Sequence, residues 1–179
     1  DGVVAQQDNY RKSGFKLAYR NIRYEGVGGG SPDRNPDIVQ LSTLPFEVID
    51  SYDRAFFPAN RSRFLQAWIN QPDSHALGFM QDGKLAGYGV IRRCRTGYKI
   101  GPLFAGMPDL AEALFLALKS RVESSHPVYL DVPEVNPAAV ALAQRHDMAV
   151  SFETARMYKG DAPDMPLERI FGVTSFELG

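Results

Sequence analysis

A short pattern that occurs twice, 133 positions apart, constrains the fold of this chain more than any other feature. The first copy begins within residues 10–15 (YRKSGF), and the second begins near Met148. In each copy a short amphipathic run ends and an alternating, strand-like run starts. A unit that occurs twice predicts two related domains, the first of them cut short. The matched positions are Phe15 and Met148, Leu17 and Val150, Tyr19 and Phe152, and Arg23 and Arg156.

Composition excludes several classes of protein. The net charge of −1 argues against a nucleic-acid partner, because general nucleic-acid binders carry a basic excess. A single cysteine, Cys94, excludes an internal disulfide and a cysteine-based zinc cluster, and it fits a cytoplasmic location. No apolar run approaches membrane-spanning length and no signal peptide is present, so we expect no membrane partner. Because the chain starts at Asp1 rather than at methionine, we expect a fragment or a processed product.

Hydrophobic spacing predicts an α/β (α+β) fold with a mixed sheet covered by helices. Asp82-Gly83 is a strong signal for a two-residue hairpin. Asn136 is suited to cap a helix that begins at Pro137. The predicted strands are 2–5, 15–24, 38–41, 76–80, 85–92, 98–104, 128–132, 149–158 and 169–178. The predicted helices are 6–13, 45–52, one capped by Asn60, one opened by Asp109, and 137–146.

This order of elements resembles the GCN5-related N-acetyltransferase (GNAT) fold, which implies a mixed, mostly antiparallel twisted sheet flanked by helices. The chain is similar to the C-terminal region of bacterial tandem GNAT proteins. The resemblance divides the chain into residues 1–26, the remnant of a first domain; residues 27–36, a Gly/Pro linker; and residues 37–179, a second GNAT-like domain. The pieces that carry it are Asp53-Arg54, Arg61 to Trp68, Gly87-Tyr88, Gly101-Pro102-Leu103, Leu130 to Pro133 with Asn136, and Arg156-Met157.

The resemblance also implies a chemistry: transfer of an acetyl group from acetyl-CoA to an amine. In this family a tyrosine within Tyr-x-x-x-Gly-Phe often protonates the departing thiolate, and Tyr10 fits that pattern. Tyr10 is therefore the candidate catalytic residue, with simple packing between helix and sheet as the alternative. The second copy has Ala143 at the position of this tyrosine.

The second copy also departs from the family's pyrophosphate loop, Gln/Arg-x-x-Gly-x-Gly/Ala. Ala105, Pro108 and Leu110 stand at its three defining positions. Proline has no N–H to offer a phosphate, and leucine places a side chain where the backbone must approach the ligand. We therefore expect residues 37–179 to be non-catalytic and not to bind acetyl-CoA.

Three residues are candidates for binding the substrate: Asp131, Asn136 and Arg156. Asp131 and Asn136 lie at a strand's C-terminal end, where open α/β folds often bind ligands, although capping alone explains Asn136. The cluster of Arg92, Arg93, Arg95 and Lys99 fits a solvated hairpin tip better than an anion site. The three histidines have no metal-ligand spacing, so no metal is expected.

Three functions remain open at this stage. The first is the C-terminal part of an N-acetyltransferase with a small-molecule amine as substrate. The second is a small-molecule-binding or regulatory module without transferase activity. The third is an active second domain with Tyr98 or Tyr158 as the acid and Gly101 or Gly106 supplying amides. Fold does not fix the acceptor, and a homodimer stays open.

Overall fold

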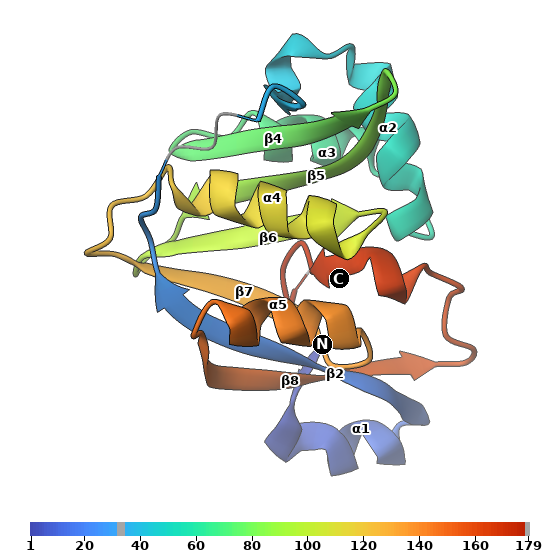
Figure 1. Ribbon diagram of the computed structural model, residues 1–179. Helices are drawn as coiled ribbons and strands as arrows, with labels where there is room; N and C mark the ends of the chain where they lie inside the picture. The colour runs from blue at the N-terminus through green and yellow to red at the C-terminus, as the bar shows by residue number, and fades with distance from the viewer. Residues whose placement is uncertain (32–34, 178–179) are drawn as a thin grey trace.

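Nine strands form one twisted sheet in the computed structural model, which describes residues 1–31 and 35–177 (Figure 1). The strands are β1 (Gly2–Val3), β2 (Phe15–Val27), β3 (Ile38–Gln40), β4 (Ser74–Gln81), β5 (Lys84–Arg93), β6 (Tyr98–Ala105), β7 (Pro127–Pro133), β8 (Ala149–Lys159) and β9 (Ile170–Gly172). The α-helices are α1 (Gln7–Lys12), α2 (Phe46–Asp53), α3 (Ser62–Ile69), α4 (Pro108–Lys119) and α5 (Pro137–Arg145). Short 3₁₀ turns are η1 (Val4–Gln6), η2 (Leu41–Thr43), η3 (Arg54–Phe56) and η4 (Leu167–Arg169).

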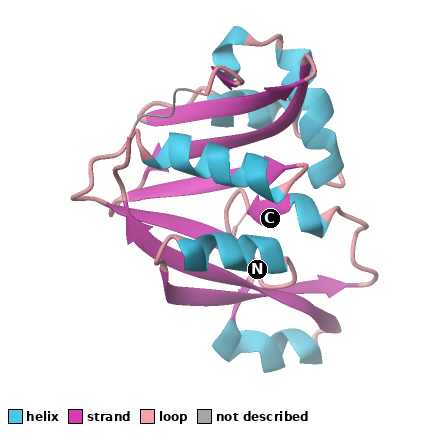
Figure 2. Cartoon of the chain, in the orientation of Figure 1, coloured by secondary structure: helices cyan, strands magenta, loops and turns pink. Residues whose placement is uncertain are grey.

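The sheet has the order β1-β8-β2-β7-β6-β5-β4-β3, and β9 pairs with β6 beside this path. Every described pair is antiparallel except β6 with β7. Helices cover both faces of the sheet (Figure 2). The predicted fold class, a mixed and mostly antiparallel sheet flanked by helices, is therefore confirmed.

Alternating side chains divide the core between the two faces. Leu77 belongs to the cluster beneath α4 and α5, whereas its neighbour Ala76 belongs to the cluster beneath α2 and α3. The period of two in β4 and β5 puts successive side chains on opposite faces. Both clusters are made of buried aliphatic and aromatic residues, so each face contributes its own hydrophobic stabilisation.

Helix ends follow the local signals. Asn136 caps α5, since its side-chain oxygen accepts hydrogen bonds from the amides of Ala138 (3.1 Å) and Ala139 (3.2 Å). The hairpin at Asp82-Gly83 has positive φ at both residues, 51° and 72°, as a tight two-residue turn requires. Helix α4 begins at Pro108, one residue before the predicted Asp109.

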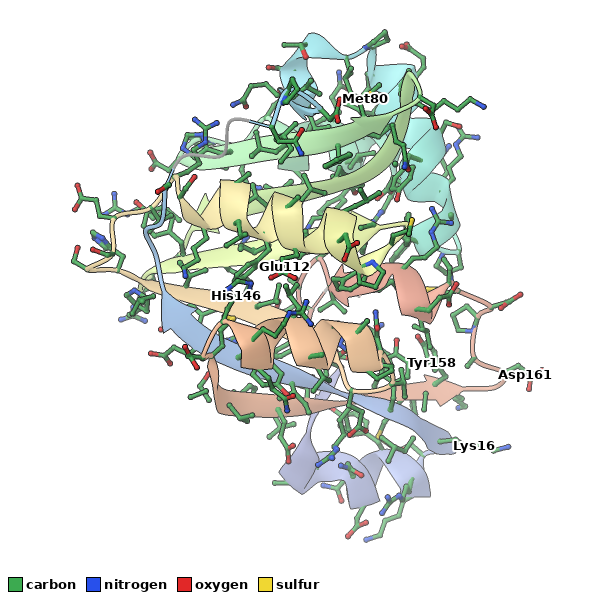
Figure 3. All side chains as sticks on the ribbon, in the orientation of Figure 1. Lys16, Met80, Glu112, His146, Tyr158 and Asp161 are labelled. Carbon is green, nitrogen blue, oxygen red and sulfur yellow. The ribbon has the colours of Figure 1, made fainter. Side chains whose placement is uncertain are left out.

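A carboxylate joins helices α4 and α5. Glu112 of α4 lies 2.7 Å from Arg145 and 2.9 Å from the Nε2 atom of His146 at the end of α5. Figure 3 shows Glu112 and His146 at the boundary of the two helices. The hydrogen bond from Arg145 is the main reason that the pKa of Glu112 lies below its usual value, so this carboxylate stays charged near neutral pH.

The position of β2 is the main feature that the sequence did not predict. It lies between β7 and β8 and pairs with both, so residues 15–27 are an internal strand of the sheet formed by the rest of the chain. The following glycines pack closely: Gly28 donates to the His126 carbonyl (2.9 Å), and a Cβ there would overlap the Glu123 carbonyl. Residues 32–34 of the predicted linker lie outside the described residues, and the proposed domain boundary stays a prediction.

The expectation of one long closing strand over residues 169–178 is wrong. The chain forms η4 and then the three-residue β9, and residues 173–177 make no strand. Strand β9 is short because it lies in the gap where β6 and β7 separate, and it pairs with β6 at only two register positions. In the part of the chain that the structure describes, no helix has the length and apolar character needed to cross a bilayer.

Candidate functional site

Strands β6 and β7 diverge, and the chain's own C-terminal segment occupies the space between them. The two strands pair in parallel from Tyr98 to Ile100 and then separate at Gly101. Strand β9 enters there and pairs antiparallel with β6, with Leu103 opposite Gly172. A Cβ on Gly101 would come within 2.7 Å of the Val173 and Thr174 carbonyl oxygens, so the segment passes directly against this backbone.

Several polar contacts fix β9 in this gap. The amide of Val173 donates to the carbonyl of Asp131 (2.9 Å), and the side-chain amide of Asn136 donates to the carbonyl of Ile170 (2.9 Å). Arg61 donates to the Thr174 hydroxyl (3.3 Å) while it is bound to the buried carboxylate of Asp53. The gap is therefore closed by main-chain and side-chain bonds from β6, β7, α5 and the start of α3.

The N-terminus of α4 is poorly suited to hold a phosphate. Pro108 has no N–H, and the neighbouring Gly106 already donates its N–H to the Ala86 carbonyl (3.0 Å). Asp109 adds a negative charge in the first turn, where an anion would have to approach. These residues, with β9 filling the gap beside them, do not fit the coenzyme A that the resemblance implies.

A pocket of about 240 Å³ lies beside this gap, near the end of β8 where Figure 3 labels Tyr158. One wall is aromatic, with the rings of Phe56 and Phe104 stacked at a centroid distance of 4.2 Å. Apolar walls with a few polar groups are typical of sites for small molecules. The lining residues are Asp1, Tyr19, Phe56, Phe57, Pro58, Phe104, Arg156, Tyr158, Pro163, Met165, Ile170, Val173 and Glu177.

The polar groups of the pocket form a connected set. Arg156 forms an ion pair with Asp1, whose carboxylate also accepts a hydrogen bond from Asn21 (2.8 Å). Burial raises the pKa of the Tyr19 hydroxyl to about 12; the positive charge of Arg156 opposes this shift and Tyr158 adds to it. Tyr19 therefore stays neutral at physiological pH. Glu177 also lines the pocket, and a hydrogen bond from Ser175 is the main cause that lowers the pKa of its carboxyl group.

Of Tyr10, Asp131, Asn136 and Arg156, the structure brings only Arg156 into this pocket, where it meets Tyr158, the alternative acid. Arg156 lines it, whereas Tyr10 lies on α1 at the edge of the sheet, 38% exposed, with its ring against Gly2 and Phe15. Asn136 caps α5 and bonds to the carbonyls of Glu168 and Ile170. The functional roles given to these residues stay predictions.

Asp131 is fully buried in a cluster of three charges. Its carboxylate oxygens lie 2.7 and 2.9 Å from the guanidinium nitrogens of Arg23 and 2.7 Å from the Nζ atom of Lys99. The members of the predicted basic cluster therefore lie in different surroundings. Lys99 is buried beside Asp131, whereas the guanidinium carbon of Arg92 lies 5.0 Å from the centroid of the Trp68 ring. Asp131 is held by these two cations and does not line the pocket.

Sequence reasoning missed most of the pocket. The sequence predicts Tyr158 only as an acid, and it assigns no role to the apolar run of Phe56, Phe57 and Pro58. Three consecutive apolar residues in a loop between two helices were the available signal. Tyr19 and Glu177 carried no local signal, because they reach the pocket only through the pairing of β2 and the path of the chain after β9.

Comparison with known proteins gives a consistent result. The family model described as "Acetyltransferase (GNAT) domain" matches residues 49–172. The chain is 25% identical over 179 residues to a holothin acyltransferase of Pseudoalteromonas sp. (strain SANK 73390) and covers 61% of that protein. It is 25% identical over 126 residues to the uncharacterized N-acetyltransferase YitH of Bacillus subtilis (strain 168) and covers 44% of it.

The solved structures agree on the fold. An acetyltransferase candidate from Pyrococcus horikoshii superimposes with a TM-score of 0.81 at 24% identity, over 100% of this chain and 58% of that one. A GCN5-related N-acetyltransferase from Sphaerobacter thermophilus gives a TM-score of 0.56 at 14% identity, over 84% and 54% of the two chains. The chain thus spans less than two thirds of the length of each of these relatives.

Proposed function

Because this chain belongs to the acetyltransferase (GNAT) family, we propose that it is the C-terminal part of a longer, tandem N-acetyltransferase that acetylates an amine with acetyl-CoA. The length of the relatives supports this proposal, since the chain covers 61% of the holothin acyltransferase that it resembles. That relative is named for acyl transfer to holothin, and the amine accepted by the present protein is a separate question.

The observation that carries the proposal is the occupation of the gap between β6 and β7 by β9. Together with Pro108 and Asp109 at the start of α4, it supports the inference that this unit does not hold the thioester. The unit described here is therefore non-catalytic, and the preceding unit of the longer protein binds acetyl-CoA. Tyr10, exposed at the edge of the sheet, belongs to that preceding unit and supplies the proton for the departing thiolate.

The pocket beside Arg156 gives the second unit a role of its own. It is a site for a small molecule, either the amine acceptor or a regulatory ligand, with aromatic walls and with Arg156 among its polar groups. Asp131 and Asn136 contribute to binding indirectly, because they hold the β9 segment that forms one wall of the pocket. Asp131 does so through its hydrogen bond with Val173, and Asn136 through its hydrogen bond with Ile170. A regulatory module without transferase activity is the alternative that this pocket supports.

Calorimetry and a turnover assay test the division of labour. We expect acetyl-CoA to bind to the longer protein and not to the chain of residues 1–179, and thiol release to require the longer protein. In that protein Tyr10→Phe should lower kcat by roughly 10²- to 10⁴-fold, as removal of a general acid does. The matched variant Tyr98→Phe should have little effect. Equal affinity for acetyl-CoA in both proteins, or turnover by residues 1–179 alone, would contradict the proposal.

A further inference from the structure

The two copies of the sequence repeat pair with each other around a local twofold axis. In the antiparallel pair of β2 and β8, Asn21 lies opposite Thr154, which is its own counterpart 133 positions later. Two residues before Asn21, Tyr19 lies opposite Arg156, and two residues after it, Arg23 lies opposite Phe152. These two pairs are equivalent, because Arg156 is the counterpart of Arg23 and Phe152 is the counterpart of Tyr19. The pairing is therefore the same when the two strands are exchanged.

The irregularities of the two strands obey the same symmetry. The register shift between Leu17 and Tyr19 leaves Ala18 unpaired, and the shift at Arg23/Tyr24 leaves its counterpart Ser151 unpaired. β-Bulges are features that a sequence specifies locally. Their symmetric placement shows that the repeat extends to the backbone of both strands.

The neighbouring elements are also equivalent. Strand β1 pairs with β8 in the same way as the end of β7 pairs with β2. In the first pair, Gly2 and Val3 lie opposite Ala155 and Thr154. In the second pair, Val132 and Pro133 lie opposite Ile22 and Asn21, which are the counterparts of Ala155 and Thr154. The helices α1 and α5 then begin four residues after Val3 and Pro133, respectively. The C-terminal ends of these helices match as well, since Gly14 and Asp147 both have positive φ.

Two buried ion pairs complete the correspondence. Asp131 of β7 binds Arg23 of β2, and Asp1 binds Arg156, the counterpart of Arg23 on β8. Both carboxylate side chains have no exposed surface, and both arginines are largely buried. Asp131 has a second ion-pair partner, Lys99, which comes from β6 on the far side of β7. The strand corresponding to β6 would lie beyond β1.

The strands therefore alternate between the two copies of the repeat, in the order β1, β8, β2, β7. We propose, on the basis of the tandem architecture proposed above, that the two units exchange strands and share one continuous sheet across the axis at Asn21 and Thr154. The polypeptide that precedes Asp1 in the longer protein extends β1 along β8. By the register of β7 on β2, the residue immediately before Asp1 lies opposite Met157, and the third residue before it lies opposite Lys159.

The surface around β1 and β8 is consistent with such a partner. Strand β8 continues to Lys159, but among the described residues β1 pairs with it only at Ala155 and Thr154, which leaves room for a longer strand along this edge. Helix α1 buries none of its residues, whereas its counterpart α5 buries Ala139, Leu142 and Ala143. A second unit of the same fold would cover α1 in the way that α4 covers α5.

Disulfide formation tests the predicted register in the longer protein. In a Cys94→Ser background, Lys159→Cys is combined with a cysteine at the third residue before Asp1, and mild oxidation should join them within one polypeptide. The matched control moves the second cysteine to the residue immediately before Asp1 and should give little product. Glu25→Cys with Tyr129→Cys, an established register pair, serves as the positive control. No intramolecular disulfide, equal yields in the test and control pairs, or a disulfide only between two molecules would overturn the proposal.

Hydrogen exchange provides a second measurement without cysteines. We expect those amides of residues 156–159 that face away from β2 to exchange at least tenfold more slowly in the longer protein than in residues 1–179, because the outer edge is then paired. Equal rates would also contradict the shared sheet. The two proposals can fail separately. If the in-register disulfide forms but the longer protein does not bind acetyl-CoA, only the proposed function is rejected. If the longer protein turns over but the disulfide does not form, only the shared sheet is rejected.

Discussion

The amide of Val173 donates a hydrogen bond to the main-chain carbonyl of Asp131 at 2.9 Å, and this contact ties the last strand of the chain to β7. It lies in the gap where β6 and β7 diverge, so that gap is part of the folded core of this unit. The same aspartate holds Arg23 and Lys99 with its side chain. One residue thus joins three strands and the C-terminal segment.

Substituting Gly172 should weaken this closure. A Cβ at residue 172 would lie 2.7 Å from a Leu130 methyl and 3.3 Å from the Leu103 Cβ, so Gly172→Ala should displace β9. We expect it to lower the free energy of unfolding by about 1–3 kcal/mol, as overpacking of a core does. Urea denaturation measures the change. Gly106→Ala is the control, because its Cβ would make only an ordinary contact, and an equal effect of both variants would contradict the explanation.

Neutralising Asp131 should be strongly destabilising. In Asp131→Asn the guanidinium of Arg23 and the ammonium of Lys99 would lose their carboxylate in a buried site. Removing one partner from such a cluster costs about 3–5 kcal/mol. Chemical denaturation should show this loss, and Asp8→Asn, at an exposed ion pair with Arg11, should change stability by less than about 1 kcal/mol. A small effect of Asp131→Asn would show that the cations find other partners.

Stability should fall at alkaline pH because of Tyr19. Burial raises the pKa of Tyr19 from 10 to about 12, so between these values the folded state binds more proton than the unfolded state. The contribution of Tyr19 to the free energy of unfolding amounts to roughly 2–3 kcal/mol. It is fully present below pH 10 and is lost as the pH rises through 12. Denaturation of the wild type and Tyr19→Phe from pH 9 to 12 measures it. The variant should lose less stability over this range, and identical profiles would refute the assignment.

Deleting residues 1–27 should prevent folding, because β7 and β8 then lose the strand that joins them. We expect residues 28–179 to lack cooperative unfolding by circular dichroism. A synthetic peptide of residues 1–30, added in trans, should restore the fold, as it supplies β1, α1 and β2 together. A peptide with Ile22→Pro is the matched control, since proline removes a ladder hydrogen bond inside a central strand. A cooperative transition without any peptide would show that β2 is dispensable.

Local chemistry allowed much of the fold to be predicted. The Asp82-Gly83 hairpin, the apolar stripe of α4 and the Asn136 cap all depend on residues close in sequence, and the structure has each of them. Pro108 likewise indicated a helix N-terminus, while the absence of an anion site there stays a prediction. The buried role of Asp131 could not be predicted, because Arg23 and Lys99 reach it from strands 108 and 32 positions away in the chain.

By itself the sequence determined the fold class, the family resemblance and the repeat that relates Asn21 to Thr154, because these follow from periodicity, turn residues and spacing. Only the tertiary structure decided that β2 joins β7 to β8, that β9 fills the gap beside Gly101, and that Arg156 meets Tyr19 in a pocket. The physical reason is that strand pairing is a long-range choice. It depends on which sheet edges are free and which side chains can be buried together, and neither is specified by the residues of one segment alone.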